Sequence, residues 1–268
     1  MTVKRLIVFA CIITSLSSSA QDSTSTQRTS KKEAKNEKRE RRNAILKQEE
    51  EGVLSYNKQT VFGLKLRTNG YGLLFELGRS KSPRFTNLYL FELTEIKHPK
   101  EERQQTTNGI FSNSFVYGKR LSFYQLKLGF GQQYIFGQKG NKNGVAVLGI
   151  YGAGLSAGFE KPYYLEVEDS TGTRADIKFD DDNFTFLNGP IYGGSGFSKG
   201  LNELRVNPGA YAKAALRFDF GRFNESIQAI EIGLSADFYS RKVKLMALND
   251  ARQLFLQGHI AFLFGRRR

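Results

Sequence analysis

The stretch K-A-A-L-R-F-D-F, Lys213 to Phe220, decides the fold class, because its polarity alternates residue by residue. With the two preceding residues included, one side carries Ala212, Ala214, Leu216, Phe218 and Phe220, and the other carries Tyr211, Lys213, Ala215, Arg217 and Asp219. Successive side chains of a strand point to opposite faces, so a period of two predicts a β-strand. Its apolar face contacts either the core of a soluble sheet or the lipid around a membrane barrel.

Seven further segments alternate in the same way, near 60–67, 73–77, 87–96, 124–131, 145–159, 230–239 and 254–264. The pattern does not assign faces to the Gly- and Ala-rich segment 145–159. Asn69-Gly70 is a strong signal for a two-residue hairpin. The connections after the second, fourth and sixth segments are short, and those after the third, fifth and seventh are longer, with 160–207 the longest; only the short first hairpin, at Asn69-Gly70, breaks this pattern.

An even number of strands, with short turns at one rim and long loops at the other, is typical of outer-membrane barrels. A soluble sandwich has no reason to sort its loops in this way. We therefore predict an all-β fold, an eight-stranded antiparallel up-and-down transmembrane β-barrel spanning 56–268. Both termini would lie on the short-turn side, the periplasm, in the cell outer membrane.

The N-terminal residues predict an exported protein. Lys4 and Arg5 precede a short apolar run, and Ser18-Ser19-Ala20 is a small-residue cleavage site, so 1–20 is predicted to be a signal peptide, with a membrane anchor as the alternative. Residues 21–55 are a charged periplasmic arm, partly helical or disordered. The arm has a second interpretation, as a basic segment that docks on anionic headgroups or on another envelope protein. Cys11 is the only cysteine, so the mature chain has no thiol chemistry.

The overall composition fits a barrel better than other classes. The chain has 268 residues, a mean hydropathy of −0.42, 22 Phe and 12 Tyr, and no window that would form a membrane helix. A membrane strand needs only about 9–11 residues, half of them polar, so its hydropathy signal is weak. The net charge of +14 is weak support for nucleic-acid binding, because the chain is exported and carries no recognition motif.

The polar faces of the strands predict a charged barrel interior. They place five cations and five anions there: Lys65, Arg67, Lys127, Lys213, Arg217, Glu76, Glu92, Asp219, Glu231 and Asp237. An eight-stranded barrel is narrow enough for its side chains to fill it, and buried charges must be paired. The balance therefore predicts an ion-pair network that plugs the lumen, rather than a selective pore, which would show an excess of one sign. A soluble barrel of lipocalin type would need the opposite arrangement of faces.

Few residues suggest other chemistry. His259 is a candidate for a lipid-modifying barrel enzyme, but no serine lies nearby in its strand, so a satisfied interior histidine is the simpler interpretation. The acidic residues Asp180 to Asp182 lack the spacing of a calcium loop, and Gly193 to Gly196 follows no strand-to-helix pattern. We expect no catalytic residue, no metal and no cofactor.

The export signal, charged arm, alternating strands and Phe-Leu-Phe-Gly-basic ending together resemble small outer-membrane β-barrel proteins of the Bacteroidota type. The resemblance covers about Thr60 to the end and includes the segments 124–133, 161–166 and 213–221. It implies a fold and supplies no catalytic residues. Three hypotheses follow: a non-enzymatic barrel that is structural or accessory to an envelope assembly, a surface binding module using 160–207, and the barrel enzyme.

Overall fold

The computed structural model describes residues 35–40, 42–43, 56–105, 113–141, 143–168, 172–222 and 225–268. The chain divides into two units, Met1–Glu51 and Gly52–Arg268. In the first unit the described residues, 35–40 and 42–43, are helical and exposed. The predicted signal peptide lies outside the described residues, as does most of the predicted arm.

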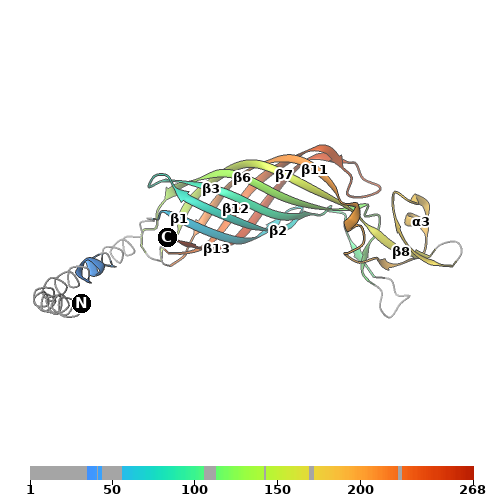
Figure 1. The fold of residues 1–268 in the computed structure, drawn as a ribbon, viewed down its shortest axis with the longest axis horizontal. Coiled ribbons are helices and arrows are strands. Elements are labelled where there is room, and N and C mark those ends of the chain that lie inside the picture. Colours follow the sequence, from blue (N-terminus) through green and yellow to red (C-terminus); the bar gives the residue numbers. More distant parts are fainter. Residues whose placement is uncertain are drawn as a thin grey trace, which may run out of the picture. The chain divides into compact units, whose positions relative to one another are not determined.

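Eight of the described strands close into one antiparallel barrel, which confirms the predicted fold (Figure 1). They are β1 (Lys58–Arg67), β2 (Gly70–Ser80), β3 (Phe85–Ile96), β6 (Leu121–Gly137), β7 (Ala146–Pro162), β11 (Arg205–Asp219), β12 (Ser226–Val243) and β13 (Arg252–Arg267). Each strand pairs with its neighbour in the chain, and β1 pairs with β13 to close the ring. Closure leaves no barrel strand with an unpaired edge, so every ladder hydrogen bond is made within the protein.

The connections are sorted between the two ends of the barrel as the sequence predicts. The turns 81–84, 138–145 and 220–225 lie at the end where β1 starts and β13 finishes, which we call the short-turn end. There the backbone N–H of Lys58 donates to the carbonyl of Arg268 at 2.8 Å. The hairpin of β1 and β2 and the connections 97–120, 163–204 and 244–251 lie at the opposite end, which we call the loop end.

The first hairpin is shifted by one residue from its expected position. Thr68 and Asn69 form the two-residue turn, because Arg67 pairs with Gly70 across it. Gly70 opens β2 with a φ of 149°, which side chains rarely tolerate, and a Cβ there would clash with the carbonyl oxygen of Glu95 in β3. The glycine is therefore required by the neighbouring strand as well as by the turn.

The outward face of the barrel is apolar around its whole circumference. Exposed Leu, Ile, Phe and Tyr side chains come from all eight strands, among them Leu64, Leu73, Phe91, Leu128, Leu155, Leu216, Leu234 and Leu256. We call this surface the apolar belt. It also carries small residues where the pattern of 145–159 was unassigned: Ala153 in β7 lies beside Ala212 in β11, which lies beside Ala236 in β12.

The loop end carries additional structure, which we call the crown (Figure 1). It contains β4 (Arg103–Gln104), β5 (Phe115–Val116), β8 (Tyr164–Glu168), β9 (Arg174–Lys178), α3 (Asn183–Asn188), β10 (Ile191–Gly194) and the 3-10 helix η1 (Leu201–Glu203). The segment that the sequence treats as one long loop is thus partly a three-stranded sheet, in the order β10-β8-β9. Among the described residues no helix is long and apolar enough to cross a membrane.

The crown has a small core of its own. Leu165, Val167 and Phe186 are fully buried together, with Phe115 packed against them. Asp182, from the acidic run that the sequence singles out, caps α3 by accepting the backbone N–H groups of Phe184 and Thr185. The carboxylate satisfies two backbone N–H groups that have no partner within the helix, so this aspartate has a structural role in the crown.

Candidate functional site: the charged barrel interior

All ten ionisable side chains that the alternation places inside the barrel face inward and are buried. They come from six strands: Lys65 and Arg67 in β1, Glu76 in β2, Glu92 in β3, Lys127 in β6, Lys213, Arg217 and Asp219 in β11, and Glu231 and Asp237 in β12. Of these ten, the residues in β1 and β6 are all cations, and those in β2, β3 and β12 are all anions. Arg217 and Glu231 pair across the adjacent strands β11 and β12, whereas pairs such as Lys65 with Glu92 join strands that are not adjacent in the sheet.

Six of these residues form a continuous network, which we call the middle cluster: Lys65, Lys213, Arg217, Glu76, Glu92 and Glu231. Arg217 Nη2 lies 2.6 Å from Glu76 Oε2 and 2.6 Å from Glu231 Oε2. Lys213 Nζ lies 3.2 Å from both Glu76 Oε1 and Glu92 Oε1. Three cations thus share three carboxylates with no net charge.

The arrangement satisfies both sides of each contact. Lys65 donates to both oxygens of Glu92, at 2.9 and 3.0 Å, and Arg217 donates through Nε as well as Nη2 to Glu231. Removing water from a charge costs several kcal/mol per ion, and only close, hydrogen-bonded pairing offsets this cost. The middle cluster therefore fills the centre of the lumen with charged groups, each stabilised by an opposite charge of the same cluster.

A second group surrounds Asp237 toward the loop end. The Asp237 carboxylate accepts from Arg67 at 2.8 Å, Lys127 at 2.5 Å, Gln257 at 2.7 Å and Gln125 at 3.1 Å. The alternation places both cations and both glutamines on the inward face, but the predicted interior set names only the charged residues. Two cations around one carboxylate leave a positive excess here, and Arg67 also donates to the neutral acceptors Thr94 Oγ1 at 2.8 Å and Gln125 Oε1 at 2.7 Å.

A third group lies at the short-turn end, around Asp219. Its partners are Lys139, from the turn 138–145, and Arg267, from the end of β13. Neither is among the predicted interior residues. The inward face of β13 runs through His259, Ala261 and Leu263, so continued alternation places Arg267 inside, and this signal was available in the sequence. Lys139 gives no such signal, because it lies in a turn.

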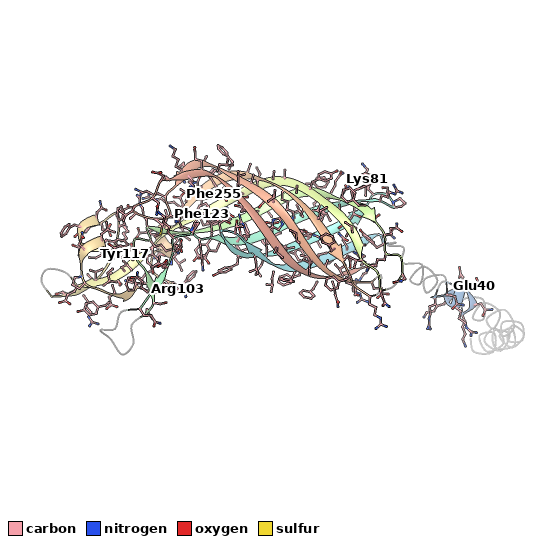
Figure 2. All side chains as sticks on the ribbon, turned by 180° about the vertical axis from the view of Figure 1, so that it is seen from behind. Glu40, Lys81, Arg103, Tyr117, Phe123 and Phe255 are labelled. Carbon is pink, nitrogen blue, oxygen red and sulfur yellow. The ribbon has the colours of Figure 1, made fainter. Side chains whose placement is uncertain are left out.

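Apolar side chains form two layers in the barrel interior. At the loop end the rings of Phe123, Tyr239 and Phe255 pack together inside the barrel, with ring centroids 5.0 to 6.2 Å apart. Figure 2 labels Phe123 and Phe255 where the barrel meets the crown. Nearer the short-turn end a second apolar layer consists of Val61, Leu74, Ile227, Ala229, Ala261 and Leu263. The middle cluster therefore lies between two apolar layers, and the Asp219 group lies at the short-turn end.

His259 contacts the middle cluster through Glu231. Its Nε2 lies 3.2 Å from Glu231 Oε1, and its Nδ1 has no hydrogen-bond partner among the described residues. Among the described residues, no serine or threonine hydroxyl is hydrogen-bonded to the ring.

Comparison with known proteins gives distant structural neighbours only. No protein-family model and no curated protein matches the chain. Neisserial surface protein A has a TM-score of 0.37 at 9% identity, covering 79% of this chain and 96% of that one. The attachment invasion locus protein Ail of Yersinia pestis has 0.34 at 10% identity, covering 80% and 100%. A structure of Ail with the heparin analogue sucrose octasulfate has 0.35 at 9% identity, covering 80% and 100%. At these values the neighbours carry no argument about this protein.

Proposed function

We propose that the protein is a small, non-enzymatic outer-membrane β-barrel protein, structural or accessory to an envelope assembly, with a lumen closed by its own side chains. One observation carries the proposal: the barrel is apolar outside and charged inside. A soluble barrel buries its apolar face, whereas a barrel in a bilayer turns that face to lipid. Membrane lipid is then the partner of the apolar belt.

The loop sorting supports an orientation for this barrel. Short turns at one end and long loops at the other are the arrangement of outer-membrane barrels, with the short turns in the periplasm. The crown would then lie outside the cell and both termini of the barrel in the periplasm. The charged arm is proposed to remain on the periplasmic side, where an envelope protein is its candidate partner. The signal peptide and the Bacteroidota-type resemblance stay predictions from the sequence.

The closed lumen is tested by conductance. We expect no single-channel current above the bilayer baseline when the purified full chain is inserted into planar bilayers, because paired charges and two apolar layers fill the interior. A shift in gel mobility between unheated and heated portions of the same sample shows that the barrel was folded. Regular ohmic steps from such a folded sample would contradict the plugged lumen.

A second candidate function is supported by the crown. A segment with its own buried core and a capped helix holds a defined surface, whereas an irregular loop does not. The crown is therefore a candidate platform for binding an external ligand or partner. A ligand that binds equally well after replacement of 163–204 by a short linker, in a barrel that still folds, would remove this candidate.

A further inference from the structure

A pocket of about 560 Å³ lies at the loop end, between the crown and the outward faces of β3, β6 and β7. Glu95, Ser122 and Tyr124 line it at the loop ends of β3 and β6, and Phe197 of the crown lies against Tyr124 with the ring centroids 6.2 Å apart. Binding sites for small ligands commonly have volumes of about 300–1,000 Å³. The pocket is therefore large enough for a small ligand or a lipid headgroup.

The charges of this pocket are not balanced. Four cations line it, Lys97, Arg103, Lys119 and Lys161, against two carboxylates, Glu95 and Glu101. Only one ion pair joins members of this set in the described part of the chain, Lys119 Nζ to Glu101 Oε2 at 2.8 Å. The pocket thus carries an excess of positive charge, in contrast to the neutral middle cluster.

Lys161 is the exceptional residue of the pocket. The residue is only 5% exposed and lines the pocket, and its ammonium has no hydrogen bond or ion pair with any described residue. Phe197 covers it, with the ammonium 4.5 Å from the ring centroid. An ammonium at the wall of a pocket without a counter-charge is available to an anion, and the charge-assisted hydrogen bond that it donates is strong.

The pocket also contains a neutral hydrogen-bond donor, the Tyr163 hydroxyl, beside its cations. The Tyr163 hydroxyl accepts the backbone N–H of Val116 at 3.1 Å, which leaves its own proton to be donated. The Lys119 ammonium lies 5.6 Å from the centre of the same ring, and both residues line the pocket. Ammonium groups and a phenol together are the donors that phosphate and related oxyanions use.

We propose that this pocket binds a phosphate-class oxyanion, with Lys161 and Lys119 as its principal cationic contacts. The bound group has two possible sources of the same chemistry, the headgroup of an anionic lipid and a free phosphate compound. The position of the pocket favours the lipid, because outward-facing Leu93 and Leu126 are paired directly below Glu95 and Tyr124. The anion site itself does not depend on the membrane placement proposed above; only the lipid source does.

The test compares two single variants of the full chain. Lys161→Gln removes the buried charge, and Lys81→Gln removes the same charge from an exposed position at the short-turn end (Figure 2). Binding is measured for inorganic phosphate and pyrophosphate in detergent, and for phosphatidylglycerol against phosphatidylcholine in lipid nanodiscs. Folding of both variants is checked by gel mobility before and after heating.

The wild-type protein is expected to bind at least one anionic probe, and Lys161→Gln to weaken that binding about tenfold or more while Lys81→Gln does not change it. Binding of phosphatidylglycerol alone would identify the lipid headgroup as the source, and binding of the free anions as well would show that the phosphate group suffices. Failure of every anionic probe to bind the folded wild type, or equal binding by Lys161→Gln, would overturn the proposal without affecting the barrel itself.

Discussion

Replacing Arg217 by methionine is expected to destabilise the folded barrel by about 3–5 kcal/mol, because Glu76 and Glu231 each lose a 2.6 Å ion pair and three buried carboxylates then share two cations. Methionine keeps much of the volume of the side chain, so the loss reports charge pairing more than packing. The measurement is equilibrium unfolding in urea of the full chain in lipid vesicles, where a change in midpoint at constant slope gives the difference in stability.

The chain offers a matched control for this variant. Arg266 also pairs with a glutamate, Glu225, at 3.2 Å, but both side chains are about two-thirds exposed. Exposed pairs contribute about 0–1 kcal/mol, so Arg266→Met is expected to change the stability little. A loss in Arg217→Met no larger than the loss in Arg266→Met would contradict the buried network.

A double variant separates the network from the single contact. In Arg217→Met with Glu76→Gln, two cations, Lys65 and Lys213, still face two carboxylates, Glu92 and Glu231, so the middle cluster stays neutral. We expect the double variant to be more stable than the sum of the single variants predicts, because neighbouring charges of one network are coupled. Strict additivity would show that Arg217 and Glu76 do not act together.

The second large effect concerns the apolar belt. Leu234→Arg is expected to cost about 2–4 kcal/mol in a bilayer, because the residue faces outward near the middle of β12 and an arginine there would lie in hydrocarbon. Its side chain is 70% exposed, and outward-facing apolar residues continue on both sides of it, Ile230 and Ile232 toward the short turns and Phe238 toward the loops.

The control for this variant is a leucine of similar exposure outside the belt. Leu248 is 76% exposed and lies in the connection 244–251 at the loop end. Leu248→Arg is expected to change the stability by no more than about 0.5 kcal/mol, as exposed substitutions in water usually do. If both leucines tolerated arginine equally in vesicles, the belt would not face lipid.

The faces of the strands could be predicted from the sequence because the period of two is a local property. Once one inward residue of a strand is identified, every second residue follows, and Lys213, Arg217 and Asp219 were placed in this way. The same reasoning extends to Arg267, which the predicted set omits although it continues the inward face of β13.

Features made by contacts between distant segments could not be predicted. The crown sheet joins β8 to β10 across α3, and its strands are too short to show a clear pattern. The contact of Lys161 with Phe197 joins β7 to a residue more than thirty positions later, in the connection 163–204. The exact hairpin position also depends on β3, because the carbonyl oxygen of Glu95 leaves no room for a Cβ at Gly70, the first residue of β2.

The central claim is that the apolar belt contacts lipid, and the absence of tryptophan from the chain allows a direct measurement. In the single-tryptophan variants Leu234→Trp and Leu248→Trp, selectively excited fluorescence reports on one position each. The measurement is the quenching of this fluorescence in vesicles whose lipids are brominated on their acyl chains. The account predicts strong quenching of the tryptophan at 234 and little at 248. Equal quenching at the two positions, or none at 234 in a folded sample, would contradict it.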